Sequence, residues 1–140
     1  YRDAVCRLLE RGGSFICYML SPDSEGSKQL IDLRKENTDD KLKTTMLRFE
    51  TFKRKNVKLA SRFKVYQFQS NPNLAAMLIY PDSEDAACLY SPYLNVLPQN
   101  SNGTGRADMP HYLVSKKTHQ MYTYIWEYVQ SYIKDSQEYL

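Results

Sequence analysis

Two stretches of the chain carry apolar side chains at almost every position, and they predict strands inside a sheet. They are residues 14–20 and 74–80. A strand that is apolar on both faces is typical of a sheet covered by helices on both sides. Residues 62–68 begin by alternating charged and apolar side chains, which predicts a strand at a sheet edge. Two further strands are predicted at residues 86–97 and 111–114.

Apolar residues at helical spacing predict helices over residues 2–11, 28–35, 38–55 and 118–138. The first should end at Gly12-Gly13, since glycine closes helices at low cost. The third should begin at Thr38-Asp39-Asp40, which supplies a capping hydroxyl and acidic side chains for the first turn. This order of elements predicts an α/β fold with a mixed central sheet flanked by helices. The 140 residues suit a single α/β domain over 1–140.

Composition limits the cellular compartments in which this domain is expected. No apolar run approaches the roughly 20 residues that span a bilayer, and no signal peptide is visible. The three cysteines (Cys6, Cys17 and Cys88) have no CxxC spacing and lie in apolar surroundings, as expected of reduced thiols. We therefore expect a cytoplasmic protein without membrane contact. Because the chain opens inside a predicted helix, we also expect 1–140 to be excised from a longer chain.

The positive charge is concentrated in one segment. The chain carries a net charge of +3, yet residues 41–64 hold nine basic residues against one acid. Such a segment can bind nucleic acid, and Lys53, Arg54 and Lys55 are the candidates for that role. The alternative is the solvated face of an amphipathic helix. It is favoured because Phe49 and Phe52 fall on the apolar stripe of that helix.

The candidate ligand site follows the first apolar strand. Asp23, Ser24 and Ser27 come directly after it and precede a helix, an arrangement that can hold an anion or a small polar molecule. Arg106, in the long polar loop 98–110, could reach the same ligand. The alternative is a plain connection in which Ser24 or Ser27 caps the helix.

No motif of a known catalytic or metal site is present. The two histidines, His111 and His119, lack HExxH spacing, and no cysteine–histidine cluster offers metal ligands. Nucleophile elbows and glycine-rich nucleotide loops are also absent from the sequence. We therefore expect no metal, no cofactor and no catalytic residue.

Residues 8–24 run from a helix through Arg-Gly and an apolar strand into Ser-Pro-Asp-Ser. This pattern resembles the phospholipase D-like domains, and residues 63–66, 74–80 and 121–132 resemble the paired strands and the closing helix that follow in that family. Active members carry a His-x-Lys-x4-Asp motif. Here the position two after His111 is Leu113, and the position two after His119 is Met121.

The resemblance therefore implies a phospholipase D-like half without its catalysis. Such degenerate domains are similar to C-terminal parts of bacterial helix–turn–helix transcriptional regulators. That likeness implies a domain that senses an unidentified small ligand or forms a homodimer, with DNA contacted only through an attached domain. Two alternatives stay open. One is an enzyme acting on phosphoesters or nucleotides through unrecognised residues, and the other is a basic nucleic-acid-binding module.

Overall fold

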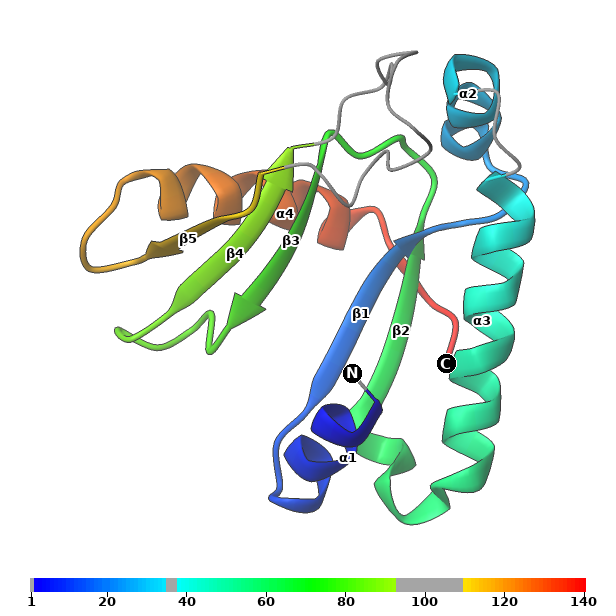
Figure 1. The fold of residues 1–140 in the computed structure, drawn as a ribbon, viewed down its shortest axis with the longest axis horizontal. Helices are drawn as coiled ribbons and strands as arrows, with labels where there is room; N and C mark the ends of the chain where they lie inside the picture. Colours follow the sequence, from blue (N-terminus) through cyan, green and yellow to red (C-terminus); the bar gives the residue numbers. More distant parts are fainter. Residues whose placement is uncertain (1, 35–37, 93–109) are drawn as a thin grey trace.

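A computed structural model describes residues 2–34, 38–92 and 110–140 and has a mixed α/β fold (Figure 1). This confirms the predicted fold class. The elements in chain order are α1 (Arg2–Glu10), β1 (Phe15–Leu20), α2 (Glu25–Arg34), α3 (Thr38–Lys55), the 3₁₀ helix η1 (Val57–Arg62), β2 (Phe63–Phe68), β3 (Leu74–Ile79), β4 (Ala87–Pro92), β5 (Tyr112–Ser115), α4 (Met121–Lys134) and β6 (Gln137–Glu138).

The strands of the described residues form two three-stranded sheets instead of one central sheet. In sheet A, β1 runs parallel to β2, and β2 pairs with β6 in antiparallel fashion. In sheet B, β3, β4 and β5 form an antiparallel meander. The prediction of a single sheet was wrong because the Asn71-Pro72-Asn73 turn redirects the chain after β2, and β3 then pairs with β4 alone.

The places predicted for β1 and β2 in the sheet are reversed. Within the described residues β2 is the middle strand of sheet A, and β1 is an edge strand. Ile16 on β1 is 50% exposed, and Met77 on β3 is 51% exposed, so neither strand is covered along both faces. An apolar sequence pattern reports how well each face can be buried, whereas the place in the sheet depends on which distant segment pairs with it.

Helix ends agree with the capping signals. Gly12 has φ +91°, and the N–H groups of Gly12 and Gly13 donate to the carbonyls of Leu9 and Leu8 at 3.1 and 3.0 Å. This is a glycine C-cap of the predicted kind. Helix α3 spans Thr38–Lys55, as predicted. Helix α4 is shorter than predicted, since the chain leaves it after Lys134 and forms β6.

The hydrophobic core has three parts. Sheet A packs against α1 and α3 through a cluster centred on Leu9, Met19, Phe63 and Val65. Sheet B packs against α4 through Ala86, Cys88, Val114, Tyr122 and Ile125. Between these clusters, Leu20, Leu30 and Phe68 join the ends of β1 and β2 to α2, and Tyr132 of α4 packs against them. This third cluster underlies the candidate site.

Candidate site at the carboxyl ends of the parallel strands

The chain leaves the two parallel strands in different directions. β1 and β2 are aligned from Phe15 with Phe63 to Leu20 with Phe68, so they end at the same edge of sheet A. After β1 the chain continues into α2 and α3 on one side. After β2 it crosses to sheet B and α4 on the other (Figure 1). Divergence of this kind opens the crevice in which α/β sheets bind their ligands.

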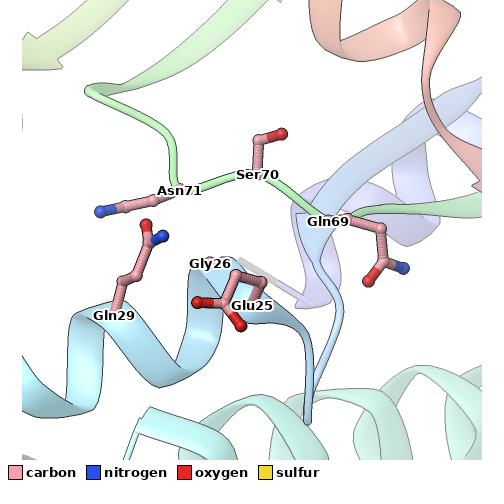
Figure 2. A pocket seen from close by; sticks show the side chains of 6 residues that line it. All are labelled: Glu25, Gly26, Gln29, Gln69, Ser70 and Asn71. Atoms are coloured by element: carbon pink, nitrogen blue, oxygen red, sulfur yellow. The ribbon is translucent and has the colours of Figure 1, made fainter.

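A cavity of about 360 Å³ lies in this crevice, between the first turns of α2 and the segment that follows β2 (Figure 2). Its volume falls at the small end of the range for ligand pockets, roughly 300–1,000 Å³. Its lining consists of Glu25, Gly26 and Gln29 from α2 and Gln69, Ser70 and Asn71 from the segment after β2. The site is therefore formed by polar residue types and is sized for a small molecule.

Gly26 sets the distance between the two walls. It is buried, and its N–H donates to the carbonyl of Gln69 at 3.0 Å. A Cβ at this position would lie 2.5 Å from the backbone nitrogen of Asn71 and 2.5 Å from the carbonyl oxygen of Gln69. Real Cβ atoms do not approach backbone atoms that closely. Only glycine therefore allows α2 to approach the 69–71 segment in this way.

Asn71 carries a buried acceptor that the rest of the described chain leaves without a partner. Its Oδ1 atom is buried and receives no hydrogen bond in the described structure. A buried polar atom left in this condition costs about 1–3 kcal/mol. Groups of this kind call for an explanation, such as a bound water or ion or a functional role. Figure 2 shows Gln29 of α2 extending toward Asn71.

Two tyrosines of α4 fix the backbone of the segment that bears Asn71. The Tyr132 hydroxyl donates to the Asn71 carbonyl at 3.1 Å, and the Asn73 N–H donates to the Tyr128 hydroxyl at 2.8 Å. The two hydroxyls are 2.8 Å apart. Burial, followed by the hydrogen bond between the Tyr128 and Tyr132 hydroxyls, raises the pKa of Tyr132 far above its ordinary value. One wall of the cavity is thus attached to α4.

The structure brings together the three predicted binding residues at the end of β1, but their polar groups already have partners within the chain. Ser24 caps α2, since its Oγ accepts the Ser27 N–H at 3.1 Å and donates to the Ser21 carbonyl at 2.6 Å. The Ser27 hydroxyl donates to the Asp39 carboxylate. Asp23 is exposed, has φ +60°, and pairs with Lys43 at 3.1 Å.

Asp39 holds this turn in place, a role that sequence reasoning missed. Besides the Ser27 hydroxyl, its Oδ1 accepts the Asp23 N–H at 3.2 Å. The hydrogen bond from Ser27, followed by the one from the Asp23 backbone, lowers the pKa of Asp39 despite an opposing contribution from burial. The acidic helix start at Thr38-Asp39-Asp40 was the available signal, but it indicated only a helix cap.

The N-terminus of α2 offers little to an anion. The Gly26 N–H donates to Gln69, the Ser27 N–H to Ser24 Oγ, and the Lys28 N–H to the Ser24 carbonyl at 3.0 Å. These are the amides that an anion would need, since helix N-termini bind anions through free N–H groups.

The other predicted residues lie elsewhere. Arg106 falls outside the described residues. Lys53, Arg54 and Lys55 form the last turn of α3, at the end opposite to the one near the cavity (Figure 1). Across the 18 residues of α3, the two ends are about 27 Å apart. Phe49 and Phe52 contact Phe63 with ring centroids 5.5 and 4.8 Å apart, as expected of core residues.

Reactive groups are scarce in the described part of the chain. Burial raises the pKa of the Cys17 and Cys88 thiols to about 11, so both are protonated and unreactive near neutral pH. His111 is exposed, and His119 Nδ1 accepts the Met121 N–H at 3.1 Å at the start of α4. Within 2–34, 38–92 and 110–140, no group of three or more His, Cys, Asp or Glu residues could hold a metal ion.

The helices of the described residues include none with the length and apolarity needed to cross a membrane. Comparisons with protein-family models, with curated proteins and with solved structures found no match.

Proposed function

We propose that this domain binds a small polar ligand in the Glu25–Asn71 cavity without transforming it. The proposal places it as the sensing part of a cytoplasmic bacterial transcriptional regulator. The observation that carries the binding proposal is a cavity at the carboxyl ends of parallel strands, one of whose lining residues, Asn71, has a buried Oδ1 without a partner in the described structure. The regulator role rests on the sequence resemblance described above.

The residues that line the cavity are the reason for proposing that the ligand is bound without catalysis. Its one ionisable side chain is Glu25. Nucleophilic catalysis requires a nucleophile hydrogen-bonded to a base, and the described structure has no hydrogen bond between Glu25 and the Ser70 hydroxyl. The other described side chains of the lining are carboxamides. These groups are suited to holding a ligand in a fixed orientation.

The attachments of the two cavity walls support a sensing role. One wall belongs to α2, whose Leu30 packs with the ends of β1 and β2. The other wall is tied through Tyr128 and Tyr132 to α4, which forms the core of sheet B. A ligand that contacts both walls would stabilise one spacing of these parts. Differential stabilisation of this kind is what a conformational sensor requires.

Replacing Asn71 with alanine tests the site. The change removes the buried unpaired acceptor, so we expect the free energy of unfolding in urea to stay equal or rise by up to about 1 kcal/mol. A panel of amino acids, sugars and nucleosides, screened by thermal unfolding, should contain compounds that raise the Tm of the unmodified protein. Those compounds should have no effect on Asn71→Ala.

Asn73→Ala is the matched control. The Asn73 side chain is exposed, and the hydrogen bond to Tyr128 is made by the backbone N–H, which alanine retains. This variant should respond to the same compounds as the unmodified protein. The proposal fails if Asn71→Ala retains the full ligand-induced rise in Tm, or if no compound raises the Tm of the unmodified protein.

A further inference from the structure

We infer that the cavity takes a ligand with a positively charged amine. This inference rests on the proposed function and concerns the chemical class of the ligand. Among the described residues that line the cavity, the only formal charge is the carboxylate of Glu25, which is exposed to solvent. The buried unpaired atom, Asn71 Oδ1, is also an acceptor. Both groups are acceptors, so a ligand that carries hydrogen-bond donors would complement them.

The donors that the described residues place around the cavity are either neutral or already paired. The first-turn amides of α2 donate to Gln69 and Ser24. The ammonium group of Lys43 is paired with Asp23, and Lys28 is exposed and does not line the cavity. An anion would thus meet the Glu25 carboxylate with only neutral donors, such as the Gln29 and Gln69 carboxamides, to offset the repulsion, whereas an ammonium group has three donors and no acceptor.

The positive end of the α2 helix dipole disfavours a cationic ligand, but this effect is smaller than the attraction between the cation and Glu25. The N-terminus of a helix acts as roughly half a positive charge. Glu25 lies in the first turn of α2 and contributes a full negative charge there. Gln29 and Gln69 have carboxamides that can present either oxygen or nitrogen, so they adapt to either kind of ligand. The net preference is for a cation.

Three probes that share a four-carbon chain and one hydroxyl group test this preference. They are 4-aminobutan-1-ol, 1,4-butanediol and 4-hydroxybutanoate, titrated into the ¹⁵N-labelled protein at neutral pH and low salt. Fragments of this size bind with dissociation constants on the order of millimolar. We expect the amine to shift the Gly26 and Asn71 amide resonances saturably. It should bind at least tenfold more tightly than the diol, while the anion should not bind.

Glu25→Gln should lower the affinity for the amine about tenfold, as expected for loss of one charge-assisted hydrogen bond. Glu10→Gln is the matched control, since Glu10 is an exposed glutamate at the end of α1. It should leave the affinity unchanged.

The outcomes separate the two proposals. Binding of the diol or the anion at the Gly26 and Asn71 resonances, as tight as that of the amine, overturns the amine inference and leaves the site standing. Equal amine affinity in Glu25→Gln also overturns it. If none of the three probes shifts these resonances, the amine inference fails, and the thermal screen with Asn71→Ala decides the proposed function separately.

Discussion

Replacing Gly26 with alanine adds one methyl group at the tightest contact of the candidate site. The new Cβ would lie 2.5 Å from two backbone atoms and 2.7 Å from a third, the carbonyl carbon of Ser70. Backbone atoms cannot rotate away as a side chain can. Helix α2 and the 69–71 segment would have to separate by about 0.5–1 Å to restore ordinary contact. The Gly26 N–H···O=C hydrogen bond to Gln69, now 3.0 Å long, would lengthen beyond its usual range.

Opposing effects decide the sign of the change in stability. Overpacking of this kind costs about 1–3 kcal/mol, and loss of the hydrogen bond adds about 0.5–1.5 kcal/mol. Alanine favours a helix over glycine by about 1 kcal/mol, which acts in the other direction. We expect Gly26→Ala to lower the free energy of unfolding by about 2 kcal/mol. With a urea m-value of about 2 kcal/mol/M, the unfolding midpoint falls by about 1 M. Ligand binding at the cavity should weaken as well.

Gly12→Ala serves as the comparison. Gly12 has φ +91°, and no other atom lies within 4 Å of the position that a Cβ would take, so alanine there meets backbone strain without a clash. It should cost about 1–2 kcal/mol and leave ligand binding unaffected. An increase in stability for Gly26→Ala, of the size that helix propensity alone would give, would refute the contact between α2 and the 69–71 segment.

Two more substitutions probe the supports of the site. Tyr132→Phe removes the hydroxyl that donates to the Asn71 carbonyl. It should lower the free energy of unfolding by about 1–2 kcal/mol, measured by urea unfolding, and weaken ligand binding, measured by titration. Asp39→Asn should remove a pH-dependent part of the stability. Because the hydrogen bond from Ser27 lowers the folded-state pKa of Asp39, its contribution is complete above the ordinary aspartate range near pH 4 and disappears as the pH falls below it. Unfolding curves recorded from pH 7 to pH 3 should therefore show a shallower loss of stability for the variant.

Each of these substitutions has a control on the same or the neighbouring helix. Tyr124→Phe alters an exposed tyrosine of α4 whose hydroxyl accepts a hydrogen bond from Gln120, and it should change stability by less than about 0.5 kcal/mol. Asp32→Asn alters an exposed carboxylate of α2 and should keep the pH profile of the unmodified protein. Equal effects in variant and control would remove the specific role assigned to Tyr132 or Asp39.

Elements marked by local chemistry were predictable from the sequence. Helix α3 has its predicted start signal at Thr38-Asp39-Asp40 and basic residues in its last turn, and it ends near Lys55, as predicted. The C-cap of α1 likewise follows from Gly12 and Gly13. Strand β6 was not predictable, because its two polar residues, Gln137 and Glu138, have no pattern of their own and acquire strand structure only by pairing with β2.

From the sequence, only the side of the site that follows β1 could be located. Asp23, Ser24 and Ser27 indicate a turn at the end of an apolar strand, so sequence reasoning pointed to the segment beside the α2 wall, but none of these three residues is among those that line the cavity. The facing wall depends on β2 lying parallel to β1, a pairing between distant segments that no local pattern encodes. Asn71 therefore appeared only as part of an Asn-Pro-Asn turn, and its buried Oδ1 could not be foreseen. Gly26 inside a helix was the remaining signal, since an interior helix glycine often marks a close approach.

The pairing of β2 with the last strand of the chain has a consequence for folding during synthesis. β1 and β2 can pair once residue 68 has been made, but the other edge of β2 gains its partner only with residues 137–140. There the N–H of Tyr139 donates to the Val65 carbonyl at 2.8 Å, and the N–H of Val65 donates to the Leu140 carbonyl at 3.0 Å. Until then β2 presents open backbone groups beside apolar side chains, the usual starting point for aggregation. A chain that stops at Lys134 would keep this edge open, so residues 137–140 cover an edge of β2 that could otherwise pair with another chain.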